Sequence, residues 1–179
     1  MNRTYNLLKQ LQKKLAGYAV SDPEAMEVEK WFPAVQEAFD RKNLVKRLSK
    51  AANEKPKAFF KQISEGFDSD SVAQVAAKVL LYSRLVDIDK IAECIGGKED
   101  IHKQCLAAYL ASQDYSSNDI EICLRSFMQT FRMAGIDSQV VFRILEDFGA
   151  KFYERDTREQ KLFANAKESY EFAYLLIVL

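Results

Sequence analysis

The sequence predicts an all-α protein built from amphipathic helices. Apolar residues recur at spacings of three and four, glycine (6) and proline (3) are scarce, and the alternating pattern typical of strands is hard to find. The 179 residues and the 48% hydrophobic content suffice for one domain with a sizeable core. No fixed-period repeat is present, so a regular solenoid is not expected.

The N-terminal residues are expected to form two helices. The first covers residues 1–16, with leucines along one side. The second opens at Pro23, after the capping oxygens of residues 21–22, and Pro33 breaks or kinks it. Its aromatic residues are expected in the core or in an N-terminal cover, namely Trp31, Phe32 and Phe39.

Shorter helices are expected along the rest of the chain, divided by glycine, proline and capping residues. Gly66 and the pair Gly96-Gly97 mark helix ends, and a cap-rich break at 116–119 precedes two strongly patterned helices. The expected ranges are 44–53, 55–65, 69–80, 87–95, 101–110, 120–131, 140–148 and 170–179.

The charge and cysteine content argue against several classes of protein. Lys and Arg total 26 and Asp and Glu total 26, so no basic excess favours nucleic acid. Cys94, Cys105 and Cys123 are isolated, which predicts buried thiols in a reducing compartment. The polar N-terminus is not a signal peptide, and no apolar run reaches the roughly 20 residues of a membrane span. A cytoplasmic protein is expected.

Residue patterns for covalent catalysis are nearly absent. His102 is the single histidine, which excludes multi-histidine metal sites and disfavours a histidine-assisted nucleophile. A surface or helix-packing role is expected for it. Gly96-Gly97-Lys98 lacks the residues of a phosphate-binding loop and is interpreted as a helix stop. No cofactor or metal is expected, and any catalysis should make and break no covalent bond.

Two groups of charged residues have structural interpretations first. A basic stripe beside Leu44 and Leu48 is interpreted as a solvated helix face in preference to a membrane contact, and it consists of Lys42, Lys46, Arg47 and Lys50. Arg125 and Arg132 are expected to bridge helices through carboxylates such as Glu121.

The run Cys105 to Arg132 carries a family resemblance. Together with the loop and helix after it, this run is similar to the Sec-seven domain of Arf guanine-nucleotide exchange factors, in which an A-L-R-x-F-L-x-x-F-R helix precedes the exchange loop. Upstream, 53–57 (N-E-K-P-K) resembles the family's F-N-x-x-P-K entry, and 87–96 resembles its A-I-G-x-Y-L-G helix. Downstream, 139–148 resembles A-Q-K-I-D-R-I-L-E-A-F, and 170–179 resembles the helix before N-T-D-L-H-N.

The resemblance implies a right-handed superhelix of antiparallel helices over residues 41–179, with 1–40 as an N-terminal helical extension. It implies an Arf-family small GTPase as partner, and peripheral association with Golgi, endosomal or plasma membrane through other parts of a longer protein. The family's acidic finger corresponds to Asp137. The expected GTPase contacts are Phe131, Arg132, Met133, Ala134, Gly135, Ile136, Gln139, Tyr170, Tyr174 and Ile177.

The sequence departs from the family at the finger loop. L-P-G-E becomes Met133-Ala134-Gly135-Ile136-Asp137, with one extra residue, no proline, and a carboxylate shorter by one methylene. An aspartate just before Ser138 is also a natural helix N-cap, and Asp137 could serve as cap, as finger or as both.

The second departure is the end of the chain, which stops where the family continues into N-T-D-L-H-N. Truncation of the groove is the favoured interpretation. Alternatively, the last apolar helix packs inside the N-terminal helices or against a second copy.

Three functional hypotheses remain open. The first is an exchange factor for an Arf-family GTPase. The second is a catalytically inactive helical module for protein–protein interaction, and the third is a helical scaffold with a coincidental resemblance.

Overall fold

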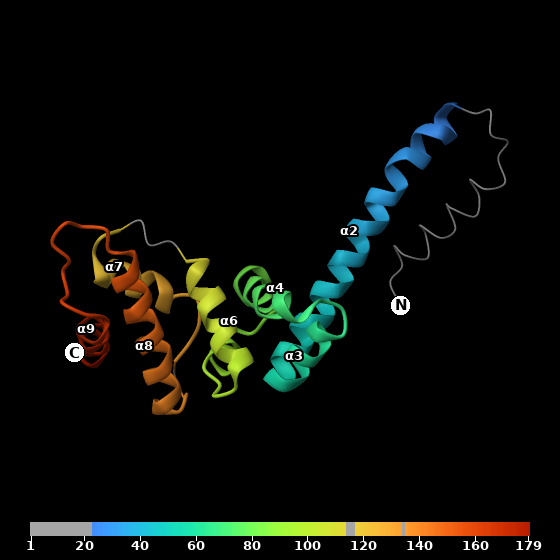
Figure 1. The fold of residues 1–179 in the computed structure, drawn as a ribbon. Coiled ribbons are helices and arrows are strands. Elements are labelled where there is room, and N and C mark those ends of the chain that lie inside the picture. The colour runs from blue at the N-terminus through green and yellow to red at the C-terminus, as the bar shows by residue number, and fades with distance from the viewer. Residues whose placement is uncertain (1–22, 114–116, 134) are drawn as a thin grey trace. The chain divides into compact units, whose positions relative to one another are not determined.

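The computed structural model describes residues 23–113, 117–133 and 135–179, which form helices and no strand. The all-α prediction is therefore confirmed. The internal contacts divide the chain into residues 1–44 and residues 45–179, and each unit is described by itself. The helices are α2 (Pro23–Glu54), α3 (Pro56–Ser64), α4 (Ser69–Tyr82), α5 (Ile88–Ile95), α6 (Asp100–Ala111), α7 (Ile120–Met128), α8 (Ser138–Arg155) and α9 (Ala166–Val178) (Figure 1).

A single helix, α2, covers Pro23–Glu54. Of the two outcomes expected at Pro33, a break or a kink, the break is therefore wrong, and so is the separate helix expected from Leu44. The end near Asn53 is confirmed. An internal proline removes one backbone hydrogen bond, and here the helix continues through it. The helix expected over residues 1–16, the caps at 21–22 and the side chains of Trp31 and Phe32 lie outside what the structure describes.

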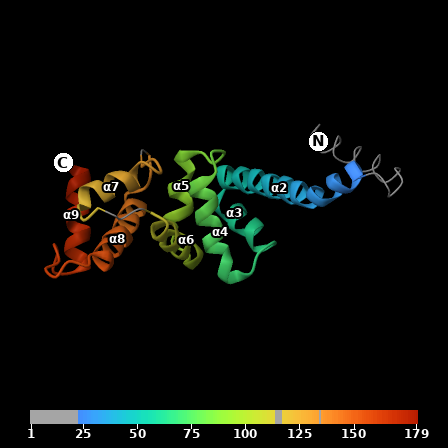
Figure 2. The same cartoon turned by 90° about the horizontal axis from the view of Figure 1, so that it is seen from above.

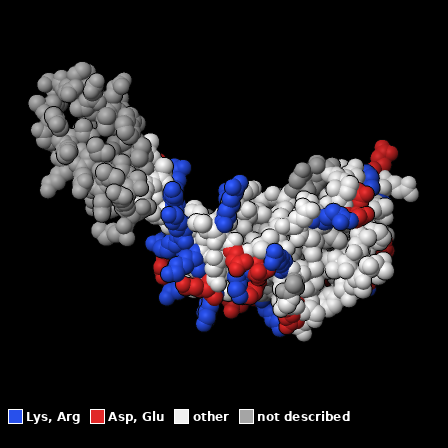
Figure 3. All heavy atoms as spheres, turned by 180° about the vertical axis from the view of Figure 1, so that it is seen from behind, with Lys and Arg blue, Asp and Glu red and all other residues white. Residues whose placement is uncertain are grey.

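Within the second unit, α2 buries one face and exposes the other. Leu48, Ala51 and Ala52 are at most 1% exposed. Lys46 and Lys50 lie on the exposed face, as the solvated-face interpretation requires. Figure 3 shows Lys and Arg side chains gathered over the C-terminal part of α2 and over α3.

The helices α3 to α6 form one part of the core (Figure 2). α4 packs on both α3 and α6, and α5 packs on α6 and α8. The expected inward residues of α3, Phe59, Phe60 and Ile63, are buried. The His102 ring meets Phe60 edge-on at 4.8 Å and donates from Nδ1 to the Cys94 carbonyl oxygen at 2.6 Å. Of the two roles expected for His102, at the surface or in helix packing, the structure shows helix packing.

The helices α7, α8 and α9 form the other part of the core. The Phe127 ring, 1% exposed, lies 6.3 Å from Tyr109, 5.1 Å from Phe131 and 5.3 Å from Phe148. α8 packs along α9, and α7 also contacts α9. No helix in the described ranges is both long and apolar enough to span a membrane.

The end of α7 differs from the expectation. The helix stops at Met128, whereas the apolar pattern continues to Phe131. The Thr130 hydroxyl and backbone N–H both donate to the Phe127 carbonyl oxygen, at 2.6 and 3.0 Å. A threonine that hydrogen-bonds a nearby carbonyl in this way competes with further helix. Phe131 is still buried, at 2% exposed, because the turn after α7 directs it into the core.

Candidate functional site

The connection between α7 and α8 carries most of the expected site residues. It begins at Gln129 and ends at Asp137, the residue before α8. Phe131 anchors the connection to the core: its ring lies edge-on to the Phe127 ring, with the ring centroids 5.1 Å apart. Phe131 is therefore a support of the loop in this structure, while Arg132, Gly135 and Asp137 are exposed.

Arg132 fastens the loop to α5. Its backbone N–H donates to the Ile88 carbonyl oxygen at 3.3 Å, and its guanidinium lies 3.6 Å from the Asp89 carboxylate. Arg132 therefore bridges two segments, as expected. Arg125 does not, because its partner Glu121, at 2.6 Å, lies one turn earlier on the same helix.

Asn53 holds the start of α5 in place. Its Nδ2 donates to the Leu85 carbonyl oxygen at 3.0 Å, and its Oδ1 accepts the Asp87 backbone N–H at 2.8 Å. Asp87 in turn caps α5 by accepting from the Asp89 N–H. Asn53 belongs to the segment that resembles the family's entry motif, and in the structure it positions the helix that anchors Arg132.

A tight turn forms the tip of the loop. The Ile136 N–H donates to the Met133 carbonyl oxygen at 3.2 Å, and Gly135 has φ of +80°. Glycine enters this region without the steric penalty that other residues meet. Ala134, one of the expected contacts, lies outside the described residues.

Replacing Gly135 by alanine should lower the free energy of unfolding by about 1 kcal/mol, because an L-residue is strained at positive φ. No atom lies within 4 Å of the added Cβ, so the loss should be conformational only. Gly135→Asn should lose less, since asparagine tolerates this conformation. Urea unfolding of both variants checks this, and equal stability of Gly135→Ala and wild type would contradict it.

Asp137 is an exposed carboxylate at the N-terminus of α8. Its Oδ1 accepts the Gln139 backbone N–H at 2.7 Å, and its carbonyl oxygen accepts from Val140 and Val141. The N-cap interpretation is therefore confirmed. The positive end of the helix dipole favours a negative charge at this position. Gln139, another expected contact, is exposed one residue beyond Ser138.

The start of α8 lies against the end of α5. A Cβ on Gly96 would come within 2.2 Å of Val140 Cγ1, and Arg143 donates from Nε and Nη2 to the Gly96 carbonyl oxygen at 3.1 and 2.7 Å. Gly96 ends α5, as expected. Its second role, the close approach of α8 that positions Asp137, was not expected.

A surface hollow of about 380 Å³ lies between α7 and α9. Met128 and Gln129 line it at the point where the Asp137 loop begins. Of the expected α9 contacts, Ile177 lines the hollow, whereas Tyr174 packs on Phe142 at 5.2 Å and Tyr170 packs on Gly149. The full lining is Glu121, Leu124, Arg125, Met128, Gln129, Leu176 and Ile177.

Leu124 and Leu176 were not among the expected contacts. Leu124 follows the helical repeat that also marks the core, and Leu176 is one residue from Ile177. Only the packing of α7 against α9 distinguishes residues that line the hollow from residues in the core.

The cysteines lie on α5, α6 and α7, outside this loop. The three cysteines are buried, as expected, and burial raises the pKa of the Cys94 thiol to about 12. Among the described residues no three His, Cys, Asp or Glu side chains gather as a metal site. The features that remain on this surface are the exposed carboxylate of Asp137 and the hollow between α7 and α9.

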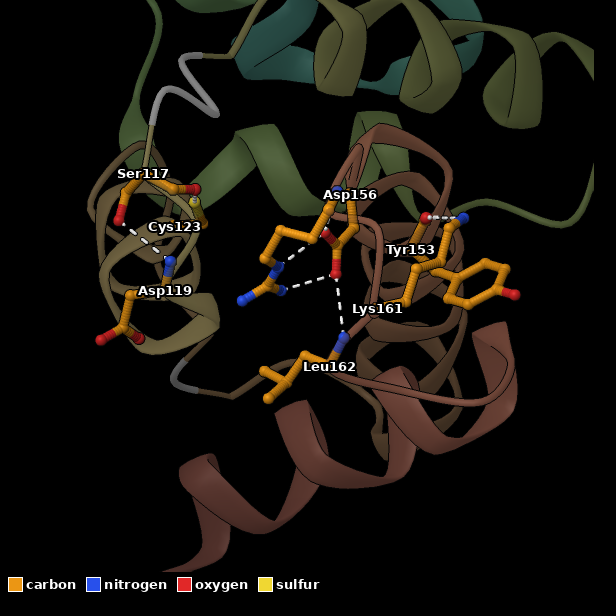
Figure 4. Close-up of polar contacts among 8 residues, drawn as sticks. Ser117, Asp119, Cys123, Tyr153, Asp156, Lys161 and Leu162 are labelled. Carbon is orange, nitrogen blue, oxygen red and sulfur yellow. Dashed lines mark hydrogen bonds and ion pairs between the residues drawn. The ribbon is translucent and has the colours of Figure 1, made fainter.

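The segment between α8 and α9 is held by a buried carboxylate (Figure 4). Asp156, whose side chain is 2% exposed, accepts from Arg158 Nε and Nη2 at 2.7 and 2.5 Å and from the Leu162 N–H at 3.1 Å. The Arg158 guanidinium and these N–H groups hold the pKa of Asp156 well below its usual range.

Stability should fall on acidification because of Asp156. A depressed pKa contributes stability above the unfolded-state pKa of about 4, and this is lost as the pH falls toward the folded-state value. Asp156→Asn should be less stable at neutral pH and should show a shallower acid decline. Urea unfolding from neutral to acidic pH measures this, with Asp100→Asn, at a side chain 92% exposed, as the matched change. Parallel curves for wild type and Asp156→Asn would contradict the assignment.

Comparisons with known proteins identify a family for most of the chain. The profile of the Sec7 domain matches residues 41–179. The Homo sapiens Brefeldin A-inhibited guanine nucleotide-exchange protein 1 is 28% identical over 158 residues, 88% of this chain and 8% of that protein. The Saccharomyces cerevisiae ADP-ribosylation factor guanine nucleotide-exchange factor SEC7 is 29% identical over 140 residues, 78% of this chain and 7% of that protein.

The solved structure of the Sec7p catalytic domain has a similar fold. Its TM-score is 0.62 at 28% identity, over 74% of this chain and 69% of that chain. This likeness confirms the predicted fold class. The chain spans less than a tenth of the length of the two curated relatives. Because the family profile covers residues 41–179, well over half of the 179 residues, this chain belongs to the Sec7 domain family.

Proposed function

We propose that the chain is a guanine-nucleotide exchange domain that binds an Arf-family small GTPase and promotes GDP release through Asp137. The relatives named as exchange factors support the activity and the kind of partner. The observation that carries the proposal is an exposed carboxylate on a loop anchored to α5, α7 and α8, next to a hollow lined by Leu124, Met128 and Ile177. Residues 41–179 form the exchange domain in this proposal, and residues 1–40 form an extension.

The loop would act by electrostatics. A carboxylate placed near the β-phosphate and the magnesium ion of bound GDP repels the phosphate, competes for the cation, and offers the phosphate-binding lysine another partner. The nucleotide then leaves because its contacts are contested. Catalysis of this kind stabilises the nucleotide-free state, and it requires one positioned anion and a docking surface.

The capping hydrogen bond is compatible with this role. A carboxylate has two oxygens, and the Gln139 N–H occupies Oδ1. The cap fixes the direction of the side chain, so the carboxylate loses little rotamer freedom when a partner approaches. Phe131, Arg132 and the Gly96 contact hold the backbone on which Asp137 is presented.

One observation favours a second candidate, a catalytically inactive Sec7 module for protein–protein interaction. Asp137 already has a complete structural role as the N-cap of α8. If that role is its only one, the hollow would bind a GTPase or another partner without exchange.

The test is release of fluorescent GDP from several Arf-type GTPases that lack the myristoylated N-terminus. Acceleration by this chain is expected, and Ile177→Glu should abolish it because a charge would enter the hollow. The matched control is Leu175→Glu, on an α9 side chain that is 52% exposed and does not line the hollow. Binding to nucleotide-free GTPase without acceleration would favour the inactive module, and absence of both would contradict both candidates.

A further inference from the structure

The strongest charge asymmetry in the second unit lies at α2 and α3. The segment 45–61 has a single acidic residue, Glu54, in a chain of zero net charge. Its basic side chains are all exposed, and within the described ranges the one ion pair among them joins Lys50 and Glu54 at 3.9 Å. These basic residues are Lys46, Arg47, Lys50, Lys55, Lys57 and Lys61.

Exposed apolar side chains adjoin this charge. Tyr82 is 71% exposed and Leu85 is 53% exposed, at the connection between α4 and α5. Two hydrogen bonds fasten this connection to α2: Ser49 Oγ lies 2.8 Å from Ser83 Oγ, and Asn53 Nδ2 donates to the Leu85 carbonyl oxygen at 3.0 Å. Tyr82 and Leu85 are thus held beside α2.

Ser49 and Asn53, which hold the connection, lie on the same side of α2 as Lys46 and Lys50. Residues 46, 49, 50 and 53 follow the spacing i, i+3, i+4 and i+7, so they share one side of the helix. Lys46 and Lys50 therefore lie beside the residues that hold the connection, and Arg84, also exposed, lies between Tyr82 and Leu85 in the sequence. We call this surface the basic–apolar face, and it consists of Lys46, Lys50, Tyr82, Arg84 and Leu85.

The acidic neighbours reduce this charge only in part. Glu54 forms an ion pair with Lys50 only at the long distance of 3.9 Å. Asp87 directs its Oδ1 to the Asp89 backbone N–H at the start of α5. Figure 3 shows that Lys and Arg predominate over Asp and Glu above the C-terminal part of α2.

We infer that the basic–apolar face binds the surface of an anionic membrane. Lysines are compact point charges suited to a diffuse layer of mobile anionic headgroups, whereas recognition of a defined phosphate or carboxylate favours the arginine fork. Tyrosine and leucine beside the charges match the headgroup boundary, where a tyrosine ring is buried and its hydroxyl stays hydrated. Tyr82 and Leu85 distinguish this face from a helix face that is only solvated.

The test is co-sedimentation of the 179-residue chain with vesicles of phosphatidylcholine alone or with about one third phosphatidylserine. We expect binding to the anionic vesicles that weakens as salt is raised. Each basic residue near such a surface contributes about fivefold to partitioning. Lys46→Glu with Lys50→Glu should therefore lower the partition coefficient by about 25-fold or more.

Two further variants make the result specific. Lys98→Glu with Lys167→Glu makes the same change of net charge elsewhere and should leave binding within about twofold of wild type. Tyr82→Ser with Leu85→Ser keeps every charge and should remove the part of the binding that resists salt. Circular dichroism should show that all variants remain helical.

Three outcomes would overturn the inference. One is equal binding of the wild type to neutral and anionic vesicles. Another is an equal loss from the Lys46/Lys50 and Lys98/Lys167 variants. The third is binding of soluble polyglutamate, lost in the Lys46/Lys50 variant, without binding to vesicles, which would assign the face to an acidic protein.

Discussion

Asp137→Asn is expected to slow GDP release by about a hundredfold while the midpoint of urea unfolding stays the same. Asparagine caps a helix about as well as aspartate, so the hydrogen bond to the Gln139 N–H is kept. The charge that would contest the phosphate and the magnesium ion is removed. The substitution therefore separates the proposed finger role of Asp137 from the cap role that the structure shows.

Three companion variants complete the test of Asp137. Asp137→Ala removes both cap and charge, so it should lose exchange and about 1 kcal/mol of unfolding free energy. Asp137→Ser should keep the cap and lose exchange, and Asp137→Lys should be the least active because it places a cation beside the phosphate-binding lysine of the GTPase. If Asp137→Asn exchanges nucleotide as fast as wild type, Asp137 is a cap only.

Gly149→Ala is expected to destabilise the protein by about 2 kcal/mol, although helix propensity alone predicts a gain of about 1 kcal/mol at the middle of a helix. The added Cβ would lie 2.6 Å from both Cα and N of Tyr170. These are backbone atoms, so α9 would have to move away from α8. Because Leu176 and Ile177 of α9 form one wall of the hollow, GTPase binding should weaken as well.

The sign of the Gly149→Ala effect in urea unfolding decides between propensity and packing. The matched control is Gly66→Ala, where the nearest atom to an added Cβ is the Ile63 carbonyl oxygen at 4.0 Å. That change should alter the unfolding free energy by no more than about 0.5 kcal/mol. A stabilised Gly149→Ala variant with unchanged GTPase binding would show that the α8–α9 contact can relax without loss.

Several parts of the site could be predicted from local pattern. The apolar repeat placed the helices, and the Asp137-Ser138 pair before an amphipathic run predicted the N-cap. The loop position followed from the resemblance. Local pattern failed at the end of α7. Phe131 continues the apolar repeat of this helix because it is a core residue, yet the Thr130 hydrogen bonds end the helix before it. At Pro33 the error is the reverse: the proline predicted an interruption, and α2 continues through it.

The sequence by itself determined the all-α class, most helix boundaries, the buried cysteines and the N-cap at Asp137, because these depend on residues within a few positions of one another. The candidate finger followed from the family resemblance. Only the tertiary structure decided that Gly96 and Gly149 are sites of close helix approach, that Asn53 holds α5, and that Ile177 rather than Tyr174 lines the hollow. These features depend on which helices pack together and at what distance. A single sequence carries no direct signal for contacts between residues far apart along the chain.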